Sequence, residues 1–382
     1  MTAPARVSKA PDTQAALDAR FMAAALSLGR RNLGATWPNP AVGVLVGRME
    51  GSEPVVIARG FTAKGGRPHA EAAALVAAGE GARGATLYVT LEPCAPHGAM
   101  APCANAIIAA GIARVVLPMK DPNPLISGKG IALLKDAGVS VTTGVCAAEA
   151  ALDHAGHIRR VRDGRPHDIL KLAVSADGKS GLAGRRPVDI SGDGSRAEAH
   201  MLRAVCDAVL IGVGTVVADD PILTCRLPGM SDRSPLRIVL DGSLGTPLGS
   251  RLVRSAREVP LWLVTRDDTP AAAEVKLREA GAEVLRVPAG AGGKLDLLAA
   301  FKALGGRGLT RLLIEGGPIL SAALIKADLV DEAVVVQSPK VLGESNLAAI
   351  DGLPLEALME NPKLRVIERR AVGPDRLTRL VR

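Results

Sequence analysis

Aromatic side chains are scarce in this sequence of 382 residues, which contains two Trp, one Tyr and three Phe. Proteins that hold single-stranded nucleic acid stack its bases on aromatic rings, so a platform of that kind is not expected here. The sequence also lacks any run of about 18 apolar residues, which excludes a membrane-spanning helix. Its five cysteines are few and odd in number, which argues against a framework of disulfides.

The first residues, Met1-Thr2-Ala3-Pro4-Ala5-Arg6, lack the apolar stretch of a secretion signal. Together with the sparse cysteines, this favours a cytoplasmic protein. Positive charge is in small excess, with 47 Lys and Arg against 39 Asp and Glu and a formal net charge of +8. Such an excess suits a phosphorylated small molecule as well as nucleic acid. Hydrophobic residues make up 48% of the chain, which is enough for a folded core, and the length fits roughly two domains.

Strands and helices are predicted to alternate along the first half of the chain. Apolar residues spaced along one face predict a helix from Gln14, with Gly29 as its stop. Short apolar runs that predict strands follow at 42–46, 55–58, 86–90, 115–117 and 139–142. Stretches with helical patterns lie at 70–78, 104–110 and 131–137. This alternation indicates a layered α/β domain over residues 14–146.

A second α/β domain is expected over residues 167–382. Residues 147–166 are interpreted as a linker that contains a connecting helix, broken by Asp163-Gly164-Arg165-Pro166. The strands predicted beyond it lie at 169–174, 208–212, 237–240, 261–264, 312–315 and 330–336.

Three metal-ligating side chains occur where predicted strands and helices meet. His69-Ala70-Glu71 follows a glycine-rich loop and opens a helix, Cys94 follows the strand at 86–90, and Cys103 begins another helix. Zinc binds imidazole and thiolate groups, and a catalytic zinc keeps a fourth position for water, so His69, Cys94 and Cys103 are the candidate ligands. Because the metal lowers the pKa of its water to about 7, Glu71 is suited to move a proton from that water to a leaving amine. The His-x-Glu and Pro-Cys pattern is that of zinc nucleobase deaminases.

Each of these residues also has an ordinary structural interpretation. His69 could simply begin a helix, Glu71 could face solvent, and the cysteines could pack as small apolar groups. All four in this order, each at a strand–helix junction, favour the metal site. His97 could be an additional ligand or a gate, although a histidine in a loop is more often neither. The remaining cysteines are interpreted as structural thiols: Cys146, Cys206 and Cys225.

The loop between the two cysteine ligands is unusually long. Deaminases of nucleosides and polynucleotides usually have Cys-x-x-Cys, whereas Cys94 and Cys103 enclose eight residues. A longer loop can cover a bulkier small molecule.

Two further segments, Thr36-Trp37-Pro38-Asn39-Pro40-Ala41-Val42-Gly43 and Asp121-Pro122-Asn123-Pro124, accompany these motifs. In these segments and their order the chain resembles the RibD family, the bifunctional deaminase/reductases of riboflavin biosynthesis, over nearly its whole length. The resemblance implies a cytidine-deaminase-like N-terminal domain and a dihydrofolate-reductase-like C-terminal domain. The first domain would deaminate 2,5-diamino-6-ribosylamino-4(3H)-pyrimidinone 5′-phosphate by zinc-dependent hydrolysis. By the same resemblance Asn39 holds the pyrimidine, and Asp121 and Asn123 lie beside the pocket.

Three positions depart from the family pattern in this half. Thr62 stands where the family commonly has histidine, Ala99 where it has Lys or Arg, and Met100 where it has Thr. A basic residue near a phosphorylated substrate makes strong charge-assisted bonds, and Lys64 or Arg67 could supply the missing charge. These departures leave open an alternative in which a degenerate deaminase domain has only a structural role beside an active reductase.

Gly316-Gly317-Pro318 lies between a predicted strand and a predicted helix. Such glycines let backbone N–H groups approach a phosphate at the helix N-terminus, although a plain strand–helix turn has the same sequence. Gly212-x-Gly214 lacks the third glycine of a Rossmann fingerprint, so that fold is not predicted.

The resemblance to the RibD family also covers this second half. It implies that NADPH donates a hydride and that the ribosylamino group of the substrate is opened and reduced to a ribitylamino group. Residues implied to contact the nucleotide are Ala173, Thr215, Asp219 and the stretch 317–323, which includes Gly317. Residues implied to contact the substrate are Arg203, Leu223, Arg226 and Glu315. Two arginines can bind a phosphate through paired N–H groups, and a glutamate can accept hydrogen bonds from sugar hydroxyls. Arginines that merely lie on the surface and a glutamate that merely ends a strand would give the same sequence.

The expected protein is thus an enzyme with zinc and NADPH as cofactors and a phosphorylated pyrimidine as substrate. We expect a homo-oligomer with no nucleic-acid partner and no membrane association. A deaminase of tRNA or DNA bases is the rival hypothesis, which the few aromatics, the long cysteine loop and the large second domain disfavour. Asp189, where the family often has Trp, leaves the fit of the nicotinamide cofactor open.

Overall fold

The computed structural model describes residues 13–95, 102–186 and 188–382. The chain divides into two compact units. Unit 1 comprises the residues up to Asn32 and Asn39–Ile158, and unit 2 comprises Leu33–Pro38 and Arg159–Arg382. None of the helices in the described ranges has both the length and the apolar character needed to cross a membrane.

Unit 1 is built on a five-stranded sheet with the order β2-β1-β3-β4-β5. Strand β1 runs antiparallel to β2 and β3, whereas β3, β4 and β5 are parallel. The strands are β1 (Gly43–Glu50), β2 (Glu53–Phe61), β3 (Thr86–Val89), β4 (Arg114–Leu117) and β5 (Ser140–Thr143). The helices are α1 (Gln14–Gly29), α2 (Ala70–Ala78), α3 (Cys103–Ala109), α4 (Lys129–Asp136) and α5 (Ala147–Asp153). Every strand and helix that the sequence predicted within residues 14–146 is present.

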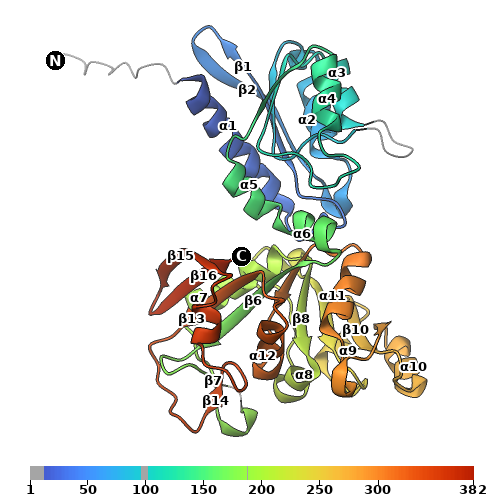
Figure 1. Ribbon diagram of the computed structural model, residues 1–382, viewed down its shortest axis with the longest axis vertical. Helices are drawn as coiled ribbons and strands as arrows, with labels where there is room; N and C mark the ends of the chain where they lie inside the picture. The colour runs from blue at the N-terminus through green and yellow to red at the C-terminus, as the bar shows by residue number, and fades with distance from the viewer. Residues whose placement is uncertain (1–12, 96–101, 187) are drawn as a thin grey trace, which may run out of the picture. The chain divides into compact units, whose positions relative to one another are not determined.

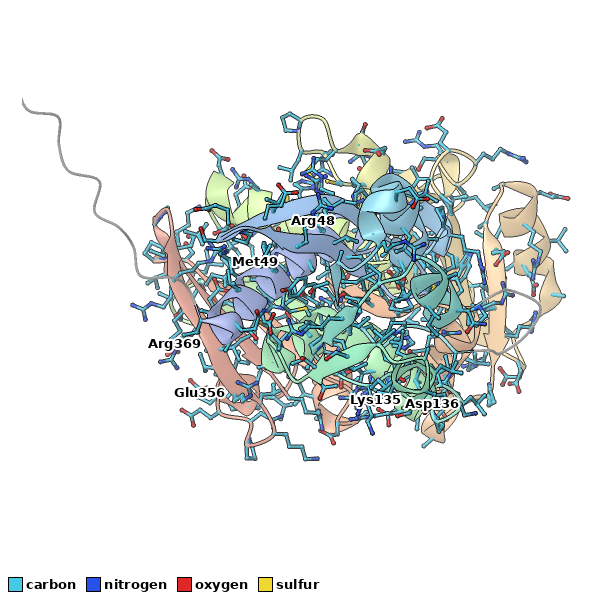
Figure 2. All side chains as sticks on the ribbon, turned by 90° about the horizontal axis from the view of Figure 1, so that it is seen from above. Arg48, Met49, Lys135, Asp136, Glu356 and Arg369 are labelled. Carbon is cyan, nitrogen blue, oxygen red and sulfur yellow. The ribbon has the colours of Figure 1, made fainter. Side chains whose placement is uncertain are left out.

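Helices cover both faces of this sheet (Figure 1), with α2, α3 and α4 on one side and α1 and α5 on the other. Alternate side chains of a strand point to opposite faces, and the core follows that rule. Val44 and Val46 of β1 pack in the cluster with α2, α3 and α4, whereas Leu45 packs with α1. Lys135 and Asp136, at the end of α4, are exposed on the outside of this layer (Figure 2).

Unit 2 contains a nine-stranded sheet with the order β11-β10-β9-β8-β12-β6-β13-β16-β15. The strands from β11 to β13 in this order are parallel, and β16 and β15 join antiparallel at one edge. The strands are β6 (His167–Val174), β8 (Ala208–Gly212), β9 (Leu236–Leu240), β10 (Leu261–Arg266), β11 (Glu283–Val287), β12 (Arg311–Ile314), β13 (Glu332–Gln337), β15 (Arg365–Val372) and β16 (Asp375–Val381). A separate antiparallel pair joins β7 (Lys179–Gly181) and β14 (Leu347–Ala348).

Two hydrophobic clusters fill the two faces of the nine-stranded sheet. One includes residues of α11 (Leu297–Gly306), α12 (Pro318–Lys326) and α13 (Glu356–Met359). The other includes residues of α7 (Asp193–Ala204), α8 (Val213–Asp219), α9 (Arg251–Arg254) and α10 (Ala271–Glu279). Helices on both faces of a parallel sheet are typical of α/β proteins, as the sequence predicted.

The connecting helix predicted within residues 147–166 is in fact two helices, α5 and α6 (Ala155–Asp163). His154 lies between them, and its Nε2–H donates to the carbonyl oxygen of Thr90 at 2.8 Å. This buried contact fixes the junction between the two helices beside the end of β3. Gly164, with φ of 70°, follows the end of α6.

Candidate active sites

His69 and Glu71 occupy the start of α2, as the sequence predicted. His69 is the N-cap residue of this helix, and Glu71 lies in its first turn. Glu71 is only 5% exposed, so its carboxyl group faces the interior rather than solvent. The interpretation of Glu71 as a solvated surface residue is therefore wrong.

The two cysteines converge on His69 from different elements. Cys94 follows β3, and Cys103 is the first residue of α3. The Nδ1 atom of His69 lies 3.9 Å from Cys94 Sγ and 3.4 Å from Cys103 Sγ. One ligand atom from each of the three residues lies within 4.8 Å of the others.

These distances fit a tetrahedral zinc ion. With bonds of about 2.0–2.3 Å, such an ion holds its ligand atoms about 3.3–3.8 Å apart. Three ligands of this kind leave the fourth position open, which is the arrangement of a catalytic rather than a structural zinc site.

The electrostatics of the three groups agree with a site built for a cation. A hydrogen bond from the Cys103 side chain lowers the pKa of Cys94 to about 4, and the His69 ring assists. The backbone N–H of Cys103 also donates to Cys94 Sγ at 3.2 Å. The pKa of Cys103 is raised by its hydrogen bond to Cys94 and by burial. Burial raises the pKa of Glu71, which suits a group that must accept and release a proton.

Glu92 is a residue of this site that the sequence analysis missed. It is 4% exposed, and its carboxylate accepts three backbone hydrogen bonds. Oε2 accepts from Asp121 N (3.0 Å) and Gly128 N (2.9 Å), and Oε1 accepts from Ile131 N (3.2 Å). Glu92 thus fixes both ends of the loop between β4 and α4. The signal in the sequence was an acidic residue between an apolar strand and Pro93-Cys94.

Close backbone packing also fixes the start of α4. A Cβ atom on Gly130 would lie 2.1 Å from the carbonyl oxygen of Pro93, so only glycine fits there. The start of α4 therefore lies directly against the residue that precedes Cys94.

Of the predicted pyrimidine-binding residues, Asp121 and Asn123 belong to this loop, whereas Asn39 lies in the segment between α1 and β1. Asp121 Oδ1 accepts from Asn123 N at 2.8 Å and lies 3.3 Å from His157 Nε2. Asn39 Nδ2 donates to the carbonyl oxygen of Gly66 at 3.1 Å. The described geometry thus ties Asp121 and Asn123 together and attaches Asn39 to the glycine-rich loop.

Of the three positions in this domain that depart from the family pattern, the structure describes only Thr62. Thr62 is buried, and its Oγ1 accepts from Val42 N at 3.0 Å, so its hydroxyl serves the backbone of unit 1. Ala99, Met100 and His97 lie outside the described residues.

Unit 2 contains a cavity of about 760 Å³. It lies where β6, β8, β9 and β12 end, which is the edge of a parallel sheet where ligands usually bind. Five residues predicted to contact nucleotide or substrate line this cavity: Ala173, Thr215, Asp219, Glu315 and Gly317. Burial raises the pKa of Asp219.

The N-terminus of α12 opens into the cavity. Gly317 is its N-cap residue, and Pro318 is at the first helical position. A Cβ atom on Gly317 would lie 3.4 Å from Thr215 Oγ1, so the glycine leaves a narrow space between the hydroxyl and the helix end. Such a space beside free backbone N–H groups fits the diphosphate of a dinucleotide.

The other predicted substrate residues do not line the cavity but lie behind Glu315. Arg203 Nη1 donates to the carbonyl oxygen of Thr224 at 3.0 Å, next to Leu223, which is 3% exposed. Arg226 is exposed, and its backbone N–H donates to His200 Nδ1 at 3.2 Å. Arg203 also binds Glu315 directly, which connects this group to the cavity.

Two further charged residues of this cavity are Lys171 and Asp189. Lys171, which the sequence analysis did not select, lines it, and burial lowers the pKa of its ammonium group. Asp189 also lines it but is largely exposed, and Arg196 Nη1 lies 3.9 Å from its Oδ1. The charge of Asp189 is therefore partly offset.

Comparison with known proteins covers both units. Residues 16–119 match the model of the cytidine and deoxycytidylate deaminase zinc-binding region, and residues 166–378 match that of the RibD C-terminal domain. The chain is 38% identical to the riboflavin biosynthesis protein RibD of Escherichia coli (strain K12), over 95% of this chain and 99% of that protein. RibD of Aquifex aeolicus is 38% identical over 94% of this chain and 97% of its own length.

Solved structures of RibD proteins also match the whole chain. RibD of Acinetobacter baumannii superposes with a TM-score of 0.83 at 32% identity, and covers 96% of this chain and 99% of its own. The diaminohydroxyphosphoribosylaminopyrimidine deaminase/5-amino-6-(5-phosphoribosylamino)uracil reductase of Thermotoga maritima gives 0.81 at 30% identity, with 97% and 99% covered. The resemblance predicted from the motifs and the predicted α/β fold class are confirmed. With both family models matched in order and full-length relatives above 30% identity, the chain belongs to the RibD family of bifunctional deaminase/reductases.

Proposed function

We propose that this protein catalyses two successive reactions of riboflavin biosynthesis. The first is hydrolytic deamination of 2,5-diamino-6-ribosylamino-4(3H)-pyrimidinone 5′-phosphate, and the second is NADPH-dependent reduction of its ribosyl group to ribityl. The observation that carries the proposal is the convergence of His69, Cys94 and Cys103 beside the buried Glu71, in a chain that also has a cavity of dinucleotide size.

In the deamination, His69, Cys94 and Cys103 would hold zinc, which would supply the acidity that activates a water molecule. Glu71 would take a proton from that water and deliver it to the departing amine. Burial raises its pKa, and a carboxyl group with a raised proton affinity is better suited to accept a proton and then release it, which supports this role. Asn39, Asp121 and Asn123 would hold the pyrimidine, with their positions fixed by the loops described above.

In the reduction, a hydride from NADPH would add to the anomeric carbon of the sugar. The bond from that carbon to the ring oxygen would break, and the oxygen would take up a proton. Ala173, Thr215, Asp219 and Gly317 would contact the nucleotide. The substrate contacts would come from four other residues: Arg203, Leu223, Arg226 and Glu315. Positioning of hydride donor and acceptor would supply much of the rate.

The two reactions are assigned to separate parts of the chain. Residues 14–146 would form the deaminase domain, 147–166 the linker and 167–382 the reductase domain. We also propose a cytoplasmic homo-oligomer that acts on the free small molecule rather than on nucleic acid or at a membrane. The few aromatic side chains support the exclusion of nucleic acid.

Zinc removal tests the assignment of the first reaction. The full-length protein is treated with a chelator and assayed separately for deamination of the diaminopyrimidine and for NADPH oxidation with deaminated substrate. We expect deamination to disappear and return with added zinc, while NADPH oxidation persists. Deamination that survives complete zinc removal would refute the metal site.

The variant Glu71→Gln separates an active deaminase from a degenerate domain. It should bind zinc normally but lose deamination, because the amide cannot carry the proton. If the wild-type protein does not deaminate, and the variant equals it in reductase activity and stability, the domain is structural.

A further inference from the structure

The cavity of unit 2 follows the edge of the sheet in a definite order. Its lining comes from the ends of β6, β12, β8 and β9, which are consecutive neighbours in the sheet. Neighbouring strands lie about 4.8 Å apart, so these four span about 14 Å. The cavity therefore fits an elongated ligand that lies across the strands.

One end of this cavity is suited to the reacting sugar. Lys171 of β6 and Glu315 after β12 line it there, and Arg203 binds Glu315 from behind. The middle contains the N-terminus of α12 with Gly317 and Thr215, which suits a diphosphate. If the reductase function proposed above is correct, the adenosine of the cofactor must extend to the remaining end.

Beyond the diphosphate position, three leucines and one ammonium group line the cavity near the end of β9 and the segment 294–297. Leu240, Leu295 and Leu297 line it, together with Lys294, whose side chain is exposed. Within the part of the chain that the structure describes, Lys294 has no ion-pair partner. By contrast, Arg196, another cation of the cavity, pairs with Asp193.

The loop that contains Lys294 is held by the surrounding structure. Gly290 N donates to the carbonyl oxygen of Lys294 at 2.7 Å, and Ala289 pairs with Leu295 in an antiparallel bridge. Arg266 donates to the carbonyl oxygen of Gly293 from the end of β10. The ammonium group is thus presented from an ordered turn at the wall of the cavity.

We propose that Lys294 binds the 2′-phosphate of NADPH and so selects NADPH over NADH, while the three leucines pack against the adenine. The two dinucleotides share every group except this phosphate, which adds close to two negative charges. A lysine ammonium binds phosphate as a point charge. The absence of an acidic partner leaves that charge available for the cofactor.

Direct binding measurements on the full-length protein test this proposal. Lys294→Met keeps most of the apolar stem and removes the charge. Calorimetry with NADPH, NADH, 2′,5′-ADP and 5′-AMP should show roughly 10- to 100-fold weaker binding of the two 2′-phosphorylated ligands, the effect expected for loss of a charged hydrogen bond. Binding of NADH and 5′-AMP should change less than about twofold. Lys302→Met, which removes an exposed lysine of α11 that does not line the cavity, is the matched control.

The possible results distinguish the role of Lys294 from the reductase function on which it rests. Equal weakening of NADPH and NADH, or no weakening of either, would overturn the role of Lys294 while wild-type binding still supports a reductase. A wild-type protein that binds neither dinucleotide would overturn the reductase function itself. Lys294→Arg, which keeps the charge, should retain the preference for 2′,5′-ADP over 5′-AMP.

Discussion

Arg203 and Glu315, 112 residues apart in the sequence, face each other through two hydrogen bonds, Nε to Oε1 at 2.8 Å and Nη2 to Oε2 at 2.6 Å. Their side chains are 12% and 14% exposed, so the pair is largely shielded from water. Although burial opposes it, the guanidinium of Arg203 keeps the pKa of Glu315 below its ordinary value. The carboxylate is therefore ionised and fixed in position at the wall of the cavity.

Breaking this pair should destabilise unit 2. In Arg203→Met the carboxylate of Glu315 stays buried without its partner, which typically costs about 3 kcal/mol. Both tryptophans, Trp37 and Trp262, belong to unit 2, so their fluorescence during urea unfolding reports on this unit. Arg196→Met, which removes a more exposed pair, is the control and should cost less than about 1 kcal/mol. Equal stability of Arg203→Met and wild type would contradict the prediction.

Glu92→Gln should impair deamination while zinc stays bound. The amide cannot accept from all three backbone N–H groups, so the loop with Asp121 and Asn123 loses its anchor. We expect the KM for the diaminopyrimidine to rise roughly tenfold, the effect of a lost charged hydrogen bond, with kcat less affected. Zinc content by mass spectrometry and NADPH oxidation by unit 2 should match the wild type.

The exposed Glu80→Gln in unit 1 provides the control for this variant. An unchanged KM in Glu92→Gln, or a loss of zinc without a change in KM, would show that Glu92 does not act through the loop.

Cys103→Ala should lower the zinc content and abolish deamination, because one of the three proposed ligands is lost. Unit 2 does not contain this site, so NADPH oxidation with deaminated substrate should stay within about twofold of the wild type. Cys146→Ala is the matched control, since Cys146 also lies in unit 1 and is not part of the metal-ligating group. Full zinc occupancy in Cys103→Ala would exclude this residue as a ligand.

Lowering the pH should remove the contribution that the ionised carboxylate of Glu332 makes to the stability of unit 2. Burial alone would raise its pKa, but hydrogen bonds from His167 (3.2 Å) and Arg379 (2.7 Å) lower it to about 2. Because this value lies below the ordinary 4.5, the ionised carboxylate stabilises the fold above pH 4.5, and the contribution disappears as the pH falls towards 2. The contribution is on the order of 3 kcal/mol.

The variant Glu332→Gln checks this pH dependence. It should be less stable than the wild type at pH 7, and the difference should shrink between pH 4.5 and pH 2.5 in urea unfolding followed by tryptophan fluorescence. Glu368→Gln, on the more exposed strand β15, should show no such trend. A constant difference over the whole pH range would refute the assignment.

Much of the secondary structure could be predicted because it depends on local patterns. The helix from Gln14 to Gly29 and the strands of unit 1 follow from apolar periodicity within a few residues. In unit 2 the local apolar pattern predicted neither β11 nor the edge hairpin of β15 and β16. Strand β15 is mostly exposed and rich in arginine, so it lacks the apolar pattern of a core strand.

The sequence by itself determined the order of the motifs and their local geometry. His69 occupies the N-cap position of a helix and Glu71 lies in its first turn, and both placements depend on neighbouring residues. Only the tertiary structure decided that Cys94 and Cys103 reach His69, that Glu92 anchors the loop before α4, and that Arg203 meets Glu315. These contacts join residues 25 to 112 positions apart, and their formation depends on how the sheets and helices pack rather than on any local preference.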